Sequence, residues 1–297
     1  MFTGLSAFPL TPLHHDAFDE STYARLISRL VEAKVDSITA LGSTGSYMYL
    51  DRAERGRVAR SAVQHAENIP VLVGIGALRT SAVQALAHDA QEAGASGLLL
   101  APVTYQGLSD DEVFTLFQDV DAQVSVPLVV YDNPGTTHVR FSEELYARIT
   151  TLEHVASIKI PGVPTDPKEA SARVRSIREH IRTGVTVGVS GDATAANGLI
   201  AGCDAWYSVI GGTLPQLALR ISRAALGGDS ASALSESARL EPLWSLFAAH
   251  GSYRVTAAIA EYLSLVAADC LPRPVLGLNA EQRALVAKVV DQLQLTD

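Results

Sequence analysis

Short apolar runs alternate with longer segments of helical periodicity over the first 214 residues. The runs lie at residues 5–8, 37–41, 71–75, 97–101, 128–131, 155–160, 185–189 and 205–209. Continuous apolar runs of this length are typical of strands buried on both faces, as in a parallel sheet covered by helices. Between them, Asp51 with Glu54 and Ser109 with Glu112 have the spacing of helix-starting capping boxes. The pattern predicts eight strand–helix units.

Eight such units in this length match an α/β fold of the closed (β/α)8 TIM barrel type. An open, doubly wound sheet is the alternative, because alternation alone does not show whether a sheet closes. The count of eight favours the barrel. Residues 1–214 are therefore predicted to form a barrel that carries the catalytic site at the C-terminal ends of its strands.

The pattern changes at residue 215. Helical segments are predicted at 217–226, 231–250, 252–268 and 281–293, with no strand between them. Gly227-Gly228 and residues 271–274 have the composition of turns. Residues 215–297 are expected to supply the closing helix of the barrel and a C-terminal helical region.

Composition limits the classes of partner. The chain of 297 residues has 32 acidic and 23 basic side chains, a formal net charge of −9, so nucleic acid and anionic membrane surfaces are not expected as partners. The first residues lack the basic and apolar regions of a signal peptide, and no apolar stretch of about 18 residues follows, so neither a signal peptide nor a membrane span is expected. Cys203 and Cys270 form no C-x-x-C motif, which favours a reducing, cytoplasmic location.

Two predicted strand ends carry residues suited to carbonyl chemistry. Lys159 ends an apolar strand, and a desolvated amine has a lowered pKa that lets it attack a ketone and form an imine. The alternative is a lysine that reaches solvent or pairs with a carboxylate. Tyr131 ends the preceding strand, where its phenol could transfer protons to the adduct. The alternative is a core tyrosine with one hydrogen-bond partner.

A third strand end carries a small anion-binding turn. The second strand leads into Gly42-Ser43-Thr44-Gly45, which lacks the spacing of a phosphate-binding loop. Its glycines allow backbone N–H groups to approach a small anion, and its two hydroxyls can bind a carboxylate. The turn is predicted to hold the carboxylate of a substrate.

These motifs occur in a defined order with others. They are Thr11-Pro12, Gly42-Ser-Thr-Gly45, Tyr131-Asp-Asn-Pro134, Ile158-Lys159 with Gly162, Ser190-Gly191-Asp192 and, in the tail, residues 272–278. In order and spacing the chain resembles the dihydrodipicolinate synthase/N-acetylneuraminate lyase family over nearly its whole length. The resemblance implies imine-forming lyases and dehydratases of class I that act on pyruvate or 2-keto acids. It also implies this barrel, no cofactor, and a homo-oligomer, either a tetramer or a dimer.

By that resemblance, Lys159 is the imine-forming lysine and Tyr131 the proton-transferring phenol. Thr44 is a proton-relay hydroxyl. Ser43, with the backbone amides of Thr44 and Gly45, forms the pocket for the substrate carboxylate.

The resemblance adds further substrate-binding residues and some departures. Gly191 and Tyr207 would line the same site. Thr136 stands where synthases carry an arginine that binds the second substrate's carboxylate, and a threonine cannot replace a bidentate guanidinium. Ser46 stands where a glutamate is usual. Tyr105 is the one tyrosine where synthases have adjacent tyrosines that relay protons across subunits.

The predicted function is therefore a lyase that forms a lysine Schiff base with pyruvate or a 2-keto acid. The reaction is an aldol cleavage or condensation, or the dehydration of a 2-keto-3-deoxy acid. One alternative is a true 4-hydroxy-tetrahydrodipicolinate synthase, which condenses pyruvate with aspartate semialdehyde. Others are a metal-dependent aldolase and a non-catalytic keto-acid-binding protein. No metal or organic cofactor is expected, because the eight histidines lack ligand spacing and Gly74-x-Gly76 lacks a third glycine.

Overall fold

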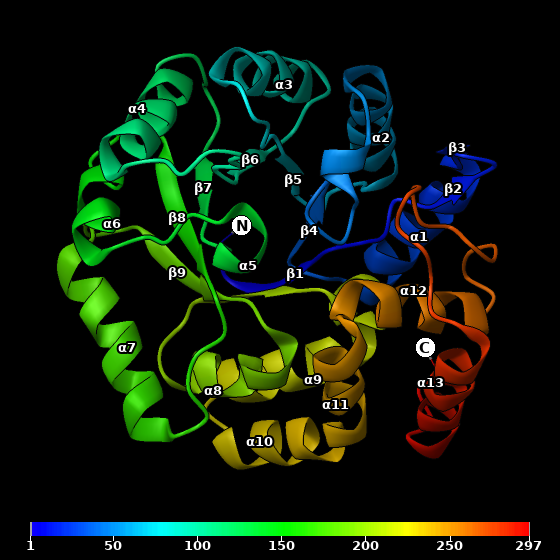
Figure 1. The fold of residues 1–297 in the computed structure, drawn as a ribbon. Coiled ribbons are helices and arrows are strands. Elements are labelled where there is room, and N and C mark those ends of the chain that lie inside the picture. The colour runs from blue at the N-terminus through cyan, green and yellow to red at the C-terminus, as the bar shows by residue number, and fades with distance from the viewer. Residues whose placement is uncertain (1, 297) are drawn as a thin grey trace.

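The computed structural model describes residues 2–296, in which eight parallel strands form a closed barrel (Figure 1). The strands are β1 (Gly4–Ala7), β4 (Ser37–Ala40), β5 (Val71–Gly74), β6 (Gly97–Leu100), β7 (Leu128–Tyr131), β8 (Val155–Ile160), β9 (Thr186–Val189) and β10 (Ala205–Ser208). Each strand pairs with its neighbours in sequence, and β10 closes the ring by pairing with β1. The predicted barrel is confirmed and the open sheet is wrong. A separate antiparallel ribbon, β2 (Leu13–His14) with β3 (Ala17–Phe18), follows β1.

Helices surround the barrel on its outside (Figure 1). They are α1 (Glu20–Ala33), α2 (Arg52–His65), α3 (Thr80–Glu92), α4 (Asp110–Asp121), α6 (Glu143–Ile149), α7 (Pro167–His180), α8 (Ala195–Ile200) and α9 (Pro215–Leu226). The capping boxes of Asp51 with Glu54 and Ser109 with Glu112 are both present, so these two predicted helix starts are confirmed. α9 contacts α1, α8 and β1 and so completes the ring.

The C-terminal region is helical, but two predicted boundaries are wrong. The single helix expected over 231–250 is broken at Leu240 into α10 (Ser230–Arg239) and α11 (Glu241–His250). Pro242 lies in the first turn of α11, and a proline has no N–H to continue a preceding helix. The helix expected over 252–268 is α12 (Ser252–Tyr262), which ends before Ser264 takes up a left-handed φ of 58°. The last helix is α13 (Ala280–Gln292).

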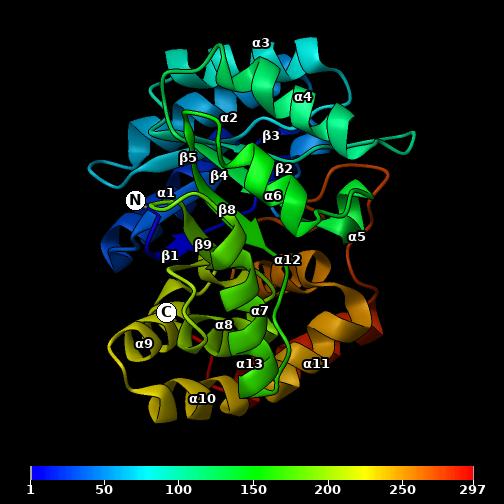
Figure 2. The same ribbon diagram turned by 90° about the vertical axis from the view of Figure 1, so that its left-hand side faces the viewer.

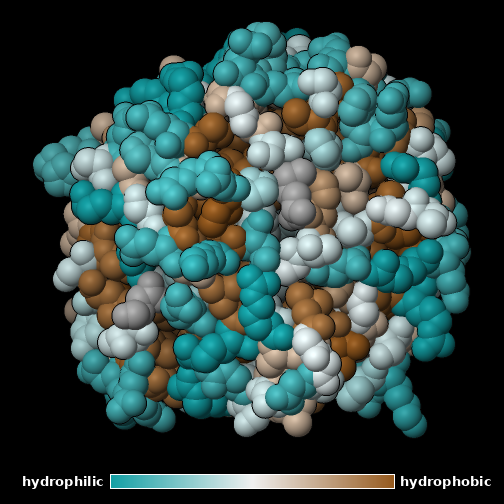
Figure 3. Space-filling model, turned by 180° about the vertical axis from the view of Figure 1, so that it is seen from behind, coloured by the Kyte–Doolittle hydropathy of each residue, from teal (hydrophilic) through white to brown (hydrophobic). Residues whose placement is uncertain are grey.

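The two ends of the barrel differ. At the end where the strands finish, the one-turn helix α5 (Pro134–Thr137) lies across the opening in Figure 1, and Figure 2 shows it at the end opposite the N-terminus. At the other end, small hydrophobic patches are each bordered by hydrophilic residues (Figure 3). Within residues 2–296, no helix has the length and apolar character needed to span a membrane.

Strand register fixes which residues share the barrel interior. Tyr131 pairs with Lys159, and Lys159 pairs with Gly188 on the next strand. Paired residues on parallel strands point to the same face, so Tyr131 and Lys159 lie side by side at the strand ends. Gly188 carries no side chain, and a Cβ there would lie 2.3 Å from the ring of Tyr207. The space that Gly188 leaves is filled by that ring.

Candidate active site

Lys159 is a buried cation with aromatic neighbours. Lys159 is 3% exposed. Its Nζ lies 4.2 Å from the ring centroid of Tyr131 and 5.4 Å from that of Phe8. The face of an aromatic ring attracts an ammonium, and the apolar ring carbons keep water away from the amine. The charge state of the lysine is therefore set by the balance between this attraction, the nearby carboxylates and burial.

Burial is the main cause of a lowered amine pKa. It brings the pKa of Lys159 down from 10.5 to about 7, against the opposing attraction of the carboxylates of Asp192 and Asp132. With a pKa of about 7, roughly half of the Lys159 amines are uncharged at neutral pH. A free amine of this kind is a nucleophile ready to attack a carbonyl carbon.

The hydroxyl of Tyr131 is held by two polar neighbours. Tyr131 Oη forms a 3.2 Å hydrogen bond with Ser43 Oγ, and Asn133 Nδ2 donates to the same oxygen at 2.9 Å. Burial raises the pKa of Tyr131 above its ordinary value, so the phenol keeps its proton at neutral pH. A protonated phenol beside the amine can donate a proton to an oxygen that leaves the adduct.

The turn after β4 is packed closely against the neighbouring strand ends. A Cβ on Gly42 would lie 2.5 Å from the ring of Phe8, and one on Gly45 would lie 2.9 Å from the backbone nitrogen of Leu41. Only residues without a side chain fit these two positions. Gly42 thus brings the backbone of this turn next to Phe8, whose ring faces the Lys159 amine, and Gly45 lets the turn fold closely onto Leu41.

The other predicted site residues differ in their contacts with the Lys159 and Tyr131 cluster. Thr44 is buried in the same turn, but the hydroxyl that contacts Tyr131 belongs to Ser43. Gly191 follows β9 with a left-handed φ of 79°, and a Cβ there would lie 3.1 Å from Gly162. Tyr207 lies one layer deeper, with its Oη bonded to Ser157 Oγ at 2.8 Å.

Tyr105 is not brought to this cluster within one chain. It lies on the segment between β6 and α4, and it is 89% exposed. Its exposure contrasts with the burial of Lys159 and Tyr131, which are 3% and 5% exposed.

Two buried carboxylates were not assigned a role from the sequence. Asp192 accepts hydrogen bonds from Trp206 Nε1 at 3.0 Å and from the backbone nitrogen of Ile210 at 2.8 Å. Asp132 accepts a hydrogen bond from Tyr146, and its Oδ1 has no partner. Burial raises the pKa of both carboxyls, and as anions both favour the charged form of the nearby lysine. The sequence signal for them is their place in the motifs that follow β7 and β9, Tyr131-Asp-Asn-Pro134 and Ser190-Gly191-Asp192.

Asn133 and Phe8 were also missed as site residues. Both lie at strand ends, and Asn133 falls inside the Tyr131-Asp-Asn-Pro134 motif. Their contacts with Tyr131 and Lys159 depend on side-chain direction, which the motif does not give.

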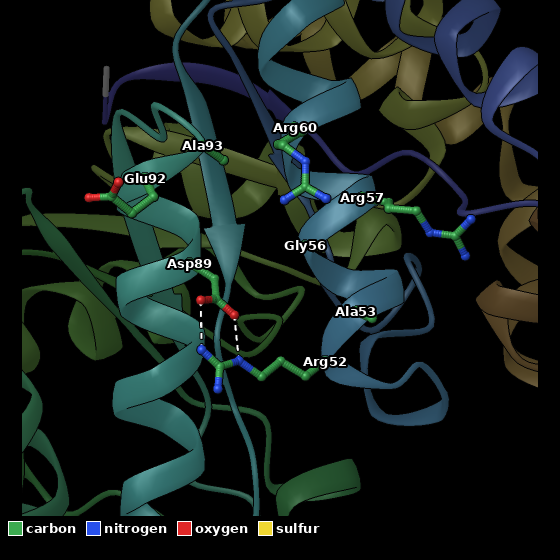
Figure 4. A pocket seen from close by; sticks show the side chains of 8 residues that line it. All are labelled: Arg52, Ala53, Gly56, Arg57, Arg60, Asp89, Glu92 and Ala93. Atoms are coloured by element: carbon green, nitrogen blue, oxygen red, sulfur yellow. Dashed lines mark hydrogen bonds and ion pairs between the residues drawn. The ribbon is translucent and has the colours of Figure 1, made fainter.

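A cavity also lies away from this cluster. A cavity of about 600 Å³ lies between α2 and α3, and Arg52 spans it with hydrogen bonds of 2.6 and 2.7 Å to Asp89 (Figure 4). Its lining includes none of the residues around Lys159, so we place the candidate chemistry at the strand ends. In the described part of the chain, no group of three His, Cys, Asp or Glu side chains is placed to share a metal ion.

The chain is similar to known proteins over its full length. The model of the dihydrodipicolinate synthetase family matches residues 1–293. The 4-hydroxy-tetrahydrodipicolinate synthase of Nitrosomonas europaea is 29% identical over 299 residues, which cover 100% of both chains. That of Alkalilimnicola ehrlichii is 31% identical over 82% of this chain and 83% of its own. A crystal structure of a dihydrodipicolinate synthase from Agrobacterium tumefaciens is 41% identical, covers 98% of each chain and superposes with a TM-score of 0.94.

The fold and the similar proteins define a (β/α)8-barrel enzyme of the class I aldolase and lyase type. The chain belongs to the dihydrodipicolinate synthetase family.

Proposed function

We propose that the protein forms a Schiff base between Lys159 and the C2 carbonyl of pyruvate or another 2-keto acid. The observation that carries the proposal is the buried Lys159 Nζ, 4.2 Å from the ring of Tyr131 and with a pKa of about 7. The hydroxyl of Tyr131 in turn meets Ser43, in the turn suited to a carboxylate. The residues proposed as nucleophile, proton donor and anion site are thus linked by contacts at the strand ends.

The first step joins the amine to the keto acid. The lone pair of Lys159 Nζ attacks C2, and a proton passes from that nitrogen to the carbonyl oxygen to give a neutral carbinolamine. Tyr131 supplies a proton to the hydroxyl, which leaves as water while the nitrogen lone pair forms the C=N bond. The product is a cationic imine, and positioned proton transfer of this kind contributes typically about 10²–10⁴-fold in rate.

The imine then acts as an electron sink. Loss of a proton from C3, or cleavage of the C3–C4 bond, leaves its electron pair in an enamine. The enamine adds to an aldehyde in the condensing direction, or expels hydroxide from C4 of a 3-deoxy sugar acid. Hydrolysis of the imine returns the free lysine. The Ser43 hydroxyl and the neighbouring amides hold the substrate carboxylate so that C2 faces Nζ.

The residue at position 136 favours substrates whose far end carries no carboxylate. Thr136 is exposed on α5, the short helix across the mouth of the barrel. A guanidinium that could grip a second carboxylate in two hydrogen bonds is replaced there by one short hydroxyl. We therefore favour a 2-keto-3-deoxy sugar acid, or an aldehyde without a carboxylate, as the compound processed.

A second candidate is the condensation of pyruvate with aspartate semialdehyde. It is supported by the names of the relatives from Nitrosomonas europaea and Alkalilimnicola ehrlichii, both 4-hydroxy-tetrahydrodipicolinate synthases. Turnover of a panel of 2-keto-3-deoxy acids, and of pyruvate with several aldehydes, separates the two candidates.

The Thr136→Arg variant helps to separate the two candidate reactions. If Thr136 excludes the second carboxylate, an arginine at this exposed position should raise turnover with aspartate semialdehyde by about tenfold, the effect of a charge-assisted pair worth 1.4 kcal/mol. Thr136→Gln, which adds length without charge, is the matched control. Efficient wild-type turnover of aspartate semialdehyde, unchanged by the arginine, would establish the second candidate instead.

Reductive trapping tests the Schiff base directly. The protein is incubated with pyruvate and cyanoborohydride and digested, and the masses of its peptides are measured by mass spectrometry. The chain contains four lysines, of which Lys34, Lys168 and Lys288 are exposed, so the adduct can be assigned to one peptide. We expect the reduced pyruvate adduct on the peptide that contains Lys159.

Three results would count against the proposal. Unmodified Lys159 after saturating pyruvate excludes the Schiff base. Reversible pyruvate binding without an adduct would indicate a keto-acid-binding protein. Turnover that EDTA abolishes and a divalent metal restores would indicate a metal-dependent aldolase.

A further inference from the structure

The C-terminal helical region reaches the loops that build the site. α12 lies on the side of the barrel where β1 and β4 are neighbours (Figure 1). A small apolar cluster joins Leu10, on the loop after β1, to Ala257 of α12 and Leu271. The same loop begins with Phe8, whose ring faces the Lys159 amine. The C-terminal helical region thus packs against the loop after β1, which helps to build the site.

One polar contact connects α12 to the turn that is suited to a carboxylate. Tyr253 Oη forms a 2.5 Å hydrogen bond with Ser46 Oγ, across 207 positions in the sequence. Ser46 is 2% exposed, so its hydroxyl has no access to bulk water. Removing the hydroxyl of the half-buried Tyr253 would leave the buried Ser46 hydroxyl without this partner. The contact therefore fixes the position of Ser46.

The backbone of Ser46 needs such an anchor. It has a φ of 59° and a ψ of 22°, in the left-handed region that side-chain-bearing residues rarely adopt. Just before this residue, the turn through Thr44 and Gly45 brings the nitrogen of Ser46 to the carbonyl of Ser43, to which it donates at 3.2 Å. Ser43 then presents its Oγ to the hydroxyl of Tyr131. A continuous chain of contacts leads from α12 to the proton-transferring phenol.

We propose that Tyr253 is a positioning residue, which acts through Ser46 to hold the Gly42-Ser43-Thr44-Gly45 turn in the geometry that receives the substrate carboxylate. The inference rests on the proposed function, because it needs that turn to bind pyruvate. It gives the C-terminal helical region a part in substrate binding as well as in stability. The resemblance described above implies a glutamate at the position of Ser46. The proposal gives Ser46 a partner within this chain, Tyr253.

The test measures how trapping at Lys159 depends on pyruvate concentration, for the wild type and for Tyr253→Phe. The substitution removes one hydroxyl and keeps the ring. We expect the half-saturating pyruvate concentration to rise about threefold to tenfold, the effect of losing one hydrogen bond. The trapping rate at saturation should stay within about twofold of the wild type, because Lys159 and Tyr131 remain in place.

Tyr262→Phe is the matched control. Tyr262 lies on the same helix and its hydroxyl also makes a hydrogen bond, at 2.8 Å to Asp291, on the side facing α13. This variant should keep the wild-type half-saturating concentration. A purely structural role for Tyr253 would lower the midpoint of thermal unfolding and leave half-saturation unchanged, as in the control.

A double-mutant cycle locates the effect at the contact. Ser46→Ala should raise half-saturation as much as Tyr253→Phe, and the double variant no more than either alone. Additive effects, unchanged half-saturation in Tyr253→Phe, or a change confined to the saturating rate would each overturn the inference. Absence of any adduct on wild-type Lys159 would instead refute the proposed function, and this is seen before any variant is made.

Discussion

The interior of the barrel holds two layers of buried polar side chains that differ in their contacts. In the deeper layer the hydroxyls are paired with one another, Ser6 with Thr39 at 2.8 Å and Ser157 with Tyr207 at 2.8 Å. In the layer at the strand ends, Lys159 Nζ faces the rings of Tyr131 and Phe8. Both layers are buried to a similar extent, so burial alone does not distinguish them.

The difference lies in what each layer costs the folded state. A buried hydroxyl pair satisfies both partners and stabilises one arrangement of strands. Burial of an amine removes the water that stabilises its charged form, and the pKa of Lys159 falls to about 7. The layer that holds a desolvated ionisable group is the one in which a nucleophile can be kept uncharged.

The largest effect is expected from Lys159→Met, which keeps length and removes the amine. Adduct formation and turnover should fall by on the order of 10⁴-fold or more, since no other buried amine can replace the nucleophile. Mass spectrometry of the trapped protein and steady-state rates measure this, with exposed Lys168→Met as the control. Residual trapping close to the wild-type rate would remove Lys159 from the mechanism.

The same variant should gain stability in a defined pH range. Lys159 has a folded-state pKa of about 7, below the ordinary 10.5 of an unfolded chain, so the cost of burying its charge is fully present below pH 7. That cost decreases as the pH rises from about 7 to the ordinary lysine pKa of 10.5, where it is gone. Urea unfolding should therefore show the largest gain for Lys159→Met at or below pH 7 and little gain near pH 10.5.

Tyr131→Phe tests the second member of the layer at the strand ends. Loss of the phenolic proton should slow turnover by about 10²–10⁴-fold, while half-saturation by pyruvate changes little. Steady-state kinetics with the best substrate of the panel give both values. A turnover rate equal to that of the wild type would assign proton transfer to another group, such as Thr44.

The pH dependence of trapping gives a smaller effect of known sign. Only the free amine attacks, and its fraction rises as the pH passes upward through a pKa of about 7. At low pyruvate concentration, the rate of adduct formation should rise about tenfold between pH 6 and pH 8 and then level off. A rate that continues to climb toward pH 10 would show an amine with an ordinary lysine pKa.

Ser6→Ala should have the smallest effect on activity. It leaves the Thr39 hydroxyl buried without its partner, which should lower the free energy of unfolding by about 1–3 kcal/mol. Trapping at Lys159 should stay within about twofold of the wild type. A loss of trapping comparable to that of Tyr131→Phe would show that the two layers are coupled, and the contrast between them would fail.

The sequence by itself determined the barrel, and it predicted where the candidate reactive residues lie along the strands. Apolar runs of four to six residues separated by helices leave few ways to bury both faces of a parallel sheet. Chemistry at the strand ends follows from the same fold, so Lys159, Tyr131 and the turn at Ser43 could be picked out. The helix break at Leu240 could not, because Pro242 is also compatible with a kinked continuous helix.

Only the tertiary structure decided which groups touch. The strand register places Tyr131 beside Lys159. The packing of the segments after the strands brings Ser43 to the phenol and leaves Tyr105 exposed. The hydrogen bond between Ser46 and Tyr253 joins residues 207 positions apart. Periodicity and motifs report local preferences. Side-chain contacts between distant segments, and the desolvation that lowers an amine's pKa, exist only once the chain is packed.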